Sequence, residues 1–273
     1  MKGGCKVNIY KFELKTYWKS FILWSLGIIV LQIIMMIFYP TMARDAQMMD
    51  LIMENYPEEL LQAIGLGEHV SLATVLGYYT FVFVFVQLLV GVQSAYYGFQ
   101  FLSVEEREHT ADFLFTKPVT RSRILVEKYL AAFTILGLTT LVVTASTFVS
   151  IELFRDGSGY EVGPLVIQLL SVPLFQLFFF SIGMLVTVGT KRIRSVISYA
   201  LGFGFGLYVL NAFRSIVGGE FLGFFTPYYH FESSYILMEG SMPMDRAIIS
   251  ISMILLAHII TYFAYLKRNI RAQ

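Results

Sequence analysis

Six long apolar runs dominate this 273-residue chain and leave little choice of fold. They cover residues 20–39, 72–102, 129–151, 162–190, 195–213 and 247–266. None contains Lys, Arg, Asp or Glu, each of which costs about 2.5–3.5 kcal/mol at the centre of a bilayer. About 20 helical residues cross the hydrocarbon, and lipid offers the backbone no hydrogen bonds. The sequence therefore predicts an all-α polytopic membrane protein, a single domain over 1–273 with six transmembrane helices.

The composition excludes the main alternatives to this fold. Only 14% of the residues are charged and 56% are hydrophobic, whereas a soluble domain carries about 25% charged residues. The apolar runs are continuous and lack the ten-residue alternation of a transmembrane β-barrel. A soluble globule and a barrel are therefore both excluded.

The distribution of positive charge predicts the orientation of the chain. With the N-terminus in the cytoplasm, all but four lysines and arginines fall on the cytoplasmic side. The four exceptions are Arg44, Arg155, Arg214 and Arg246. Short cytoplasmic loops of membrane proteins carry this excess. We therefore expect a multi-pass membrane protein with both termini cytoplasmic.

Residues 7–19 have the pattern of an amphipathic helix lying on the membrane surface. Lys11, Lys15 and Lys19 share one side of such a helix. The other side carries the apolar residues Val7, Tyr10, Leu14, Tyr17, Trp18 and Phe21. We favour an interfacial helix; the alternative is a simple extension of the first span.

Glycines and aromatic residues mark two places for close contact near the fifth span. Gly202 and Gly206 form a GxxxG pair that lets helix backbones approach, either within the chain or between subunits. Residues 218–231 are aromatic and broken by Gly and Pro, which predicts a segment at the outer interface or dipping into the membrane.

His258 lies inside the sixth span, where it is either functional or simply bonded to a neighbouring helix.

A polar island at residues 105–123 separates the second and third runs. Acidic residues precede a short helical stretch over 111–115, which Pro118 interrupts. Thr120 can then cap a new helix that leads into the third span. Phe113 and Phe115 lie in this charged loop, and exposed aromatic residues there indicate contact with another surface. The island is the best candidate for a partner-binding site.

No catalytic or metal-binding motif accompanies the island. The chain has no G-x-x-x-x-G-K-[ST] phosphate loop, no G-x-S-x-G turn and no H-E-x-x-H helix. Its four histidines lie in separate segments. We therefore expect no catalytic residue, cofactor or metal in this chain.

The island resembles the first cytoplasmic loop of the ABC-2 type transporter permeases. The matching residues, in order, are Glu105, Glu106, Thr110, Leu114, Pro118, Val119, Thr120, Arg121 and Lys128. His109 replaces the glycine that this family has before the threonine. The resemblance implies a cytoplasmic coupling helix between spans 2 and 3 that seats on a separate ABC ATPase subunit.

This resemblance also implies the partners and the transport role. ATP and Mg would be bound by the ATPase, and a second permease subunit and membrane lipid complete the expected partners, with no nucleic acid. The expected function is export of an apolar or amphipathic substrate such as a lipid, peptide or drug. A membrane scaffold or sensor that docks a partner through the same loop is the alternative. The implied coupling residues are Glu105, Glu106, Arg107, Glu108, Thr110, Asp112, Phe113, Phe115, Pro118 and Arg121.

Overall fold

The computed structural model of this chain describes residues 8–45, 55–57, 60–61, 66, 70–107, 119–190 and 193–267. Its helices are α1 (Ile9–Met36), α2 (Tyr39–Arg44), α5 (Val75–Arg107), α7 (Arg121–Phe154), α8 (Val162–Gly189), α9 (Val196–Val217), α10 (Glu220–Gly223), α11 (Pro227–His230), α12 (Ser233–Glu239) and α13 (Met244–Lys267). No strand occurs within these ranges. Six of the helices are long and apolar enough to cross a membrane, and each overlaps one of the expected runs. The prediction of an all-α polytopic membrane protein is confirmed.

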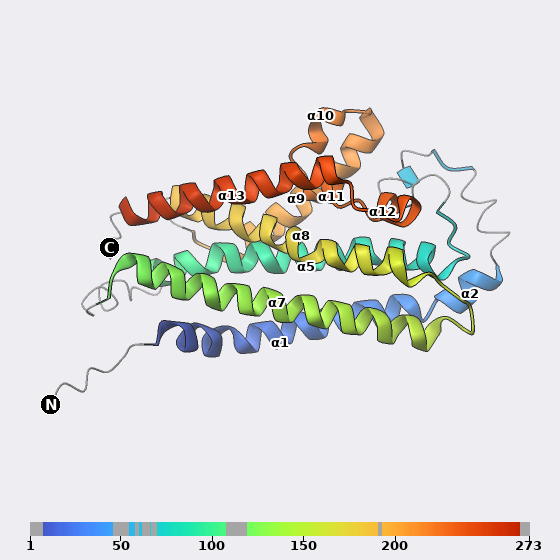
Figure 1. The fold of residues 1–273 in the computed structure, drawn as a ribbon, viewed down its shortest axis with the longest axis horizontal. Coiled ribbons are helices and arrows are strands. Elements are labelled where there is room, and N and C mark those ends of the chain that lie inside the picture. The colour runs from blue at the N-terminus through green and yellow to red at the C-terminus, as the bar shows by residue number, and fades with distance from the viewer. Residues whose placement is uncertain are drawn as a thin grey trace.

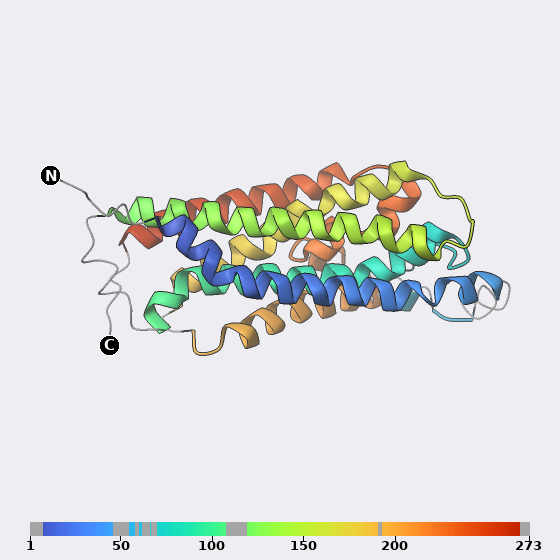
Figure 2. The same cartoon turned by 90° about the horizontal axis from the view of Figure 1, so that it is seen from below.

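The six long helices form an elongated bundle around α5 (Figure 1). On one side of α5, α1 and α7 lie side by side, and α8, α9 and α13 lie on the other (Figures 1 and 2). The first turn of α1 and the last turn of α13 are at the same end of the bundle, here called the terminal end. The opposite end, which holds α2 and α12, is called the distal end.

Helices α5 and α8 pack closely at a pair of glycines. A Cβ atom on Gly98 of α5 would lie against the backbone oxygen of Phe180 and 3.1 Å from the Cα atom of Gly183. A Cβ on Gly183 would lie 3.2 Å from the backbone oxygen of Ala95. Small residues at such a crossing let two helix backbones approach, which favours helix association in lipid.

Buried amide side chains join the other helices to this central pair. Gln32 Nε2 on α1 donates to the Tyr79 hydroxyl on α5 at 3.0 Å and to Thr147 Oγ1 on α7 at 3.1 Å. Gln93 on α5 donates to Thr139 Oγ1 on α7, also at 3.0 Å. Hydrogen bonds between helices add stability where the surrounding lipid supplies no partners.

The N-terminal segment is not a separate interfacial helix. Residues 9–36 form the single helix α1, so the alternative, an extension of the first span, is the one found. No Gly or Pro lies between residues 9 and 26 to break the helix, although Figure 2 shows that its first turns run at an angle to the rest. Its buried side chains recur every fourth residue along a stripe that begins Ile9, Glu13, Tyr17, Phe21. Packing against α7, instead of a bilayer surface, accounts for this stripe.

The connection between α9 and α13 dips into the bundle, as expected for residues 218–231. The Tyr228 hydroxyl of α11 donates to the backbone oxygen of Gly204, about two turns into α9. Phe231 is fully buried, and its backbone oxygen accepts a hydrogen bond of 3.0 Å from Gln87 on α5. The segment is thereby fixed to both α9 and α5.

The GxxxG pair of α9 does not pack against any of the helices that the structure describes. A Cβ on Gly202 or Gly206 would meet nothing within 4 Å, whereas one on Gly204 would lie 2.5 Å from Val92 Cγ2 of α5. Gly204 is therefore the glycine that seats α9 on α5. The other reading of Gly202 and Gly206, an interface between subunits, stays a prediction.

We expect Gly98→Ala to lower the melting temperature of the purified protein in detergent. The added methyl group would have to displace backbone atoms of α8, and overpacking of this kind costs about 1–3 kcal/mol. The matched control is Gly27→Ala in α1, where a Cβ meets nothing within 4 Å. This control should be neutral or stabilising, because Ala is the better helix former by about 1 kcal/mol. Equal melting temperatures for the two variants would contradict the tight crossing.

Candidate functional site

The two flanks of the polar island, the end of α5 and the start of α7, lie at the terminal end. Glu105, Glu106 and Arg107 form the last turn of α5. Glu108, Thr110, Asp112, Phe113, Phe115 and Pro118 lie outside the described residues. The proposed coupling helix and the roles of these side chains therefore stay predictions. The structure does describe how the second flank of the island is held.

Thr120 begins α7, as its sequence predicts. Its backbone is extended, and its hydroxyl accepts a hydrogen bond of 3.3 Å from the backbone N–H of Arg123. This is the usual geometry of an N-cap residue, and it satisfies one of the free donors of the first turn. The island therefore ends at a defined helix start.

Lys128, two turns into α7, forms a buried ion pair. Its Nζ atom lies 2.9 Å from Glu13 Oε1 of α1, and the two side chains are 1% and 5% exposed. The same Nζ donates to the backbone oxygen of Phe101 in α5 at 2.6 Å. One ammonium group thus joins α7 to both α1 and α5. Removing either charge would take the ion-pair partner away from a buried charge, which is strongly destabilising.

The residue before this lysine holds the start of α1. Glu127 accepts a hydrogen bond of 3.2 Å from the backbone N–H of Tyr10, in the first turn of α1. Arg123 Nε donates to the other carboxylate oxygen of Glu127 at 2.8 Å. A carboxylate at a helix N-terminus satisfies free N–H groups and interacts favourably with the helix dipole. Together with the Lys128–Glu13 pair, this bond joins the start of α7 to the start of α1 at two points.

Two further contacts connect the same part of α7 to α13. Arg121 Nη1 donates to the backbone oxygen of Leu266 at 3.4 Å. His258 Nδ1 lies 3.1 Å from the Tyr129 hydroxyl, and the two rings pack edge to face. For His258, the simpler alternative of a bond to a neighbouring helix is the one found.

The first three turns of α7 thus form a junction of four spans. Residues 121–129 contact α1, α5 and α13 directly after the polar island ends. The described residues contain no group of three His, Cys, Asp or Glu side chains that could hold a metal ion. The start of α7 is therefore joined by side-chain contacts to three other spans.

Glu13 was not singled out from the sequence, although a signal for it exists. It is the one acidic residue among the lysines of the first 19 residues, and it falls on the same side of α1 as Ile9 and Tyr17. A lone carboxylate within an apolar stripe indicates a buried partner of opposite charge. The sequence gives no means of choosing Lys128 as that partner.

The sequence was compared with models of known protein families. A family described as ABC-2 family transporter protein matches residues 7–270. The chain belongs to this family. A comparison with curated proteins found no match.

Membership confirms the resemblance seen in the polar island. The chain is the membrane-spanning permease component of an ABC transporter. Permeases of this family work with ABC ATPase subunits in general. The six apolar helices and the family together make the permease a multi-pass membrane protein.

Disrupting the Lys128 pair should test how strongly the junction holds the fold. We expect Lys128→Met and Glu13→Gln each to lower stability by roughly 3–5 kcal/mol, because each leaves a buried group without its charged partner. The double variant should lose less than the sum of the two. Thermal unfolding of the four proteins in detergent measures this coupling. Strict additivity would show that the two charges do not interact.

Proposed function

We propose that this permease couples ATP hydrolysis by a separate ATPase subunit to export of an apolar or amphipathic substrate. The family match over residues 7–270 carries the proposal. The chain itself has no phosphate-binding loop motif. The free energy for transport would therefore come from ATP hydrolysis by a separate protein that contacts the permease.

The polar island is the proposed contact with the ATPase. Its sequence matches the family's coupling segment, and it joins α5 directly to the junction at the start of α7. Phe113 and Phe115 would be the apolar anchors, with the acidic residues around them at the rim of the interface. Movement of the ATPases would then shift α7 and, through Lys128 and Arg121, the spans connected to it.

A pocket between α7 and α8 supports the proposed substrate class. It has a volume of about 300 Å³, at the lower end of the range for small-molecule sites. Phe133, Leu136, Pro173 and Leu177 line it with apolar atoms, and Gly137 leaves space on the α7 side. Thr140 and Gln176 supply its polar groups, and the Thr140 hydroxyl donates to Gln176 Oε1 at 2.8 Å.

A second permease subunit is proposed to pack on α9. Only 17% of the most apolar stretch of α9 is buried within this chain, the smallest share among the six spans. Gly202 and Gly206 lie on its exposed side, where a neighbouring backbone could approach closely. For the orientation in the membrane, we propose that both termini are cytoplasmic, because the segments rich in lysine and arginine then fall on the cytoplasmic side.

Removing the two aromatic anchors should uncouple transport without unfolding the permease. We expect the double variant Phe113→Ala/Phe115→Ala to weaken co-purification of the ATPase at least tenfold, since loss of two interface anchors costs 2 kcal/mol or more, roughly. The ATPase activity that depends on the permease should fall in parallel. Co-purification and ATPase activity are both measured on the complex obtained by expressing the permease together with its ATPase.

The matched control is Phe221→Ala. Phe221 is an exposed phenylalanine of α10, near the distal end, and its loss should leave the complex intact. A double variant that keeps full co-purification and full activity would show that the island is not the docking site.

Pairing through α9 makes a separate prediction. Gly206→Leu should reduce the fraction of permease dimers, because the larger side chain prevents close approach of the two helices. Gly27→Leu adds the same side chain to the exposed side of α1 and should leave pairing unchanged. Chemical cross-linking in membranes measures the dimer fraction of each variant. Equal cross-linking in the two variants would remove α9 from the interface.

A further inference from the structure

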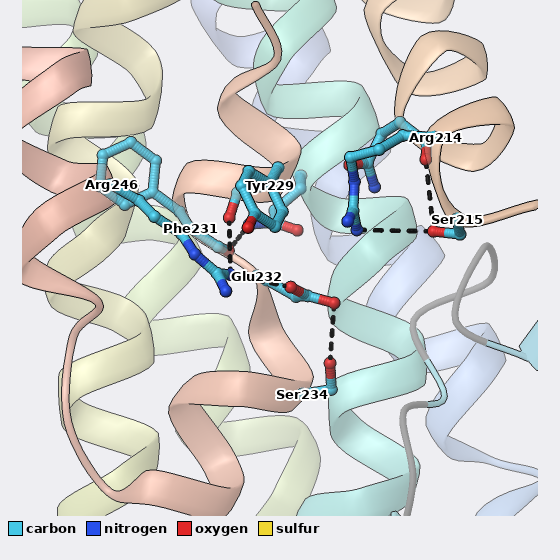
Figure 3. Close-up of polar contacts among 9 residues, drawn as sticks. Arg214, Ser215, Tyr229, Phe231, Glu232, Ser234 and Arg246 are labelled. Carbon is cyan, nitrogen blue, oxygen red and sulfur yellow. Dashed lines mark hydrogen bonds and ion pairs between the residues drawn. The ribbon is translucent and has the colours of Figure 1, made fainter. Parts of the chain in front are cut away.

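Two arginines from different spans stack on one tyrosine towards the distal end. The guanidinium carbon of Arg214, in the last turn of α9, lies 4.1 Å from the centre of the Tyr229 ring of α11. The guanidinium carbon of Arg246, in the first turn of α13, lies 3.9 Å from the same centre. Figure 3 shows the two side chains on either side of the ring. The ring therefore holds two cations at a defined spacing.

The charges of this cluster do not balance. Arg246 Nη1 lies 3.1 Å from Glu232 Oε2 and also donates to the Tyr229 backbone oxygen at 3.4 Å. The polar contacts of Arg214 are with neutral groups, the Asn211 amide oxygen at 3.3 Å and the Ser215 hydroxyl at 3.5 Å. The cluster thus contains two guanidiniums and one carboxylate, which leaves a net charge of about +1.

The neighbouring histidine does not add to this charge. His230 is 1% exposed, and its Nδ1 lies 2.7 Å from the Ser250 hydroxyl. Burial, and after it the charge of Arg246, lowers the pKa of His230 to about 4. At neutral pH its imidazole is uncharged, so the excess positive charge belongs to the arginines.

The other arginines on this side of the permease are paired with acids. Arg44 lies 3.4 Å from Asp156, and Arg155 lies 2.9 Å from Glu152. Within the described part of the chain, Arg214 is the arginine of this group without a carboxylate partner. A half-buried cation at this position is costly unless an anion approaches it.

The surroundings of Arg214 indicate where that anion comes from. Phe213, Phe221, Phe224 and Phe225 are all exposed and belong to α9, α10 and the turn after α10. In a membrane protein such an aromatic group lies at the boundary between hydrocarbon and headgroups. The guanidinium of Arg214, at the end of a span, then reaches the depth of lipid phosphates.

We propose that Arg214, held against the face of the Tyr229 ring, binds the phosphate of an anionic phospholipid in the leaflet at the distal end. A guanidinium matches a phosphate with two parallel hydrogen bonds, and the tyrosine ring pre-orients it. The bound lipid also neutralises the cluster at the point where α9, α11 and α13 meet. The site is separate from ATPase docking and does not depend on it.

The test compares lipids on the purified permease in detergent. Dioctanoyl-phosphatidylglycerol should raise the melting temperature more than dioctanoyl-phosphatidylcholine, whose headgroup has no net charge. Native mass spectrometry counts the bound lipids. In Arg214→Gln we expect the preference for phosphatidylglycerol to fall about tenfold, because the charge-assisted contact with the phosphate is lost. The control Arg155→Gln removes a distal arginine that is already paired and should keep the preference.

Three outcomes would overturn the proposal. The first is an unchanged lipid preference in Arg214→Gln, and the second is no preference in the wild-type permease. The third is equal stabilisation by inorganic phosphate at the same concentration, which would make the site one for the free ion. Arg214→Lys keeps the charge but loses the planar fork, so it should retain part of the preference. If Arg214→Gln fails to fold, a full lipid preference in Arg214→Lys is evidence against two parallel hydrogen bonds from the Arg214 guanidinium to the phosphate.

Discussion

The contact between Gly98 and Gly183 is the constraint around which the bundle is built. Lipid gives apolar helices little reason to associate, so stability depends on close packing and on hydrogen bonds between helices. The glycine pair brings α5 and α8 together, and 78% of the most apolar stretch of α5 is then buried within the bundle. Gly204 seats α9 on the same central helix, and α13 packs on α8. Helices α9 and α13 thus pack on the outside of the α5–α8 pair.

The outer helices are held differently. Only 28% of the apolar stretch of α1 and 33% of that of α7 are buried, and polar contacts connect them to the centre. The Glu13–Lys128 pair lies at the terminal end, and Gln32 and Gln93 lie deeper in the bundle. The centre of the bundle is therefore held by close packing of small residues, and its outer helices are held mainly by buried polar contacts.

The sequence predicts the local features of this permease well, and the long-range contacts poorly. Charge-free apolar runs identify the six spans, and Thr120 identifies the start of α7, because each depends on neighbouring residues alone. Spacing alone does not show which face of a helix meets a neighbour, so the contact of Gly204 with Val92 could not be read from the sequence. Lys128 and Glu13 are 115 positions apart, and only the fold brings them together. The described residues stop at the edges of the polar island, so its roles rest on the family pattern.

Helix α7 has a mechanical consequence that follows from its length. It runs for 34 residues, contains no proline, and has Lys128 near one end as one of its buried attachments. With about 1.5 Å per residue, some 10 Å of the rod lie on the island side of that attachment and about 40 Å lie beyond it. A rigid tilt about Lys128 therefore moves the far tip of α7 about four times as far as the near tip. Because Thr139 and Thr147 lie on the long arm, such a tilt has to break their hydrogen bonds to Gln93 and Gln32.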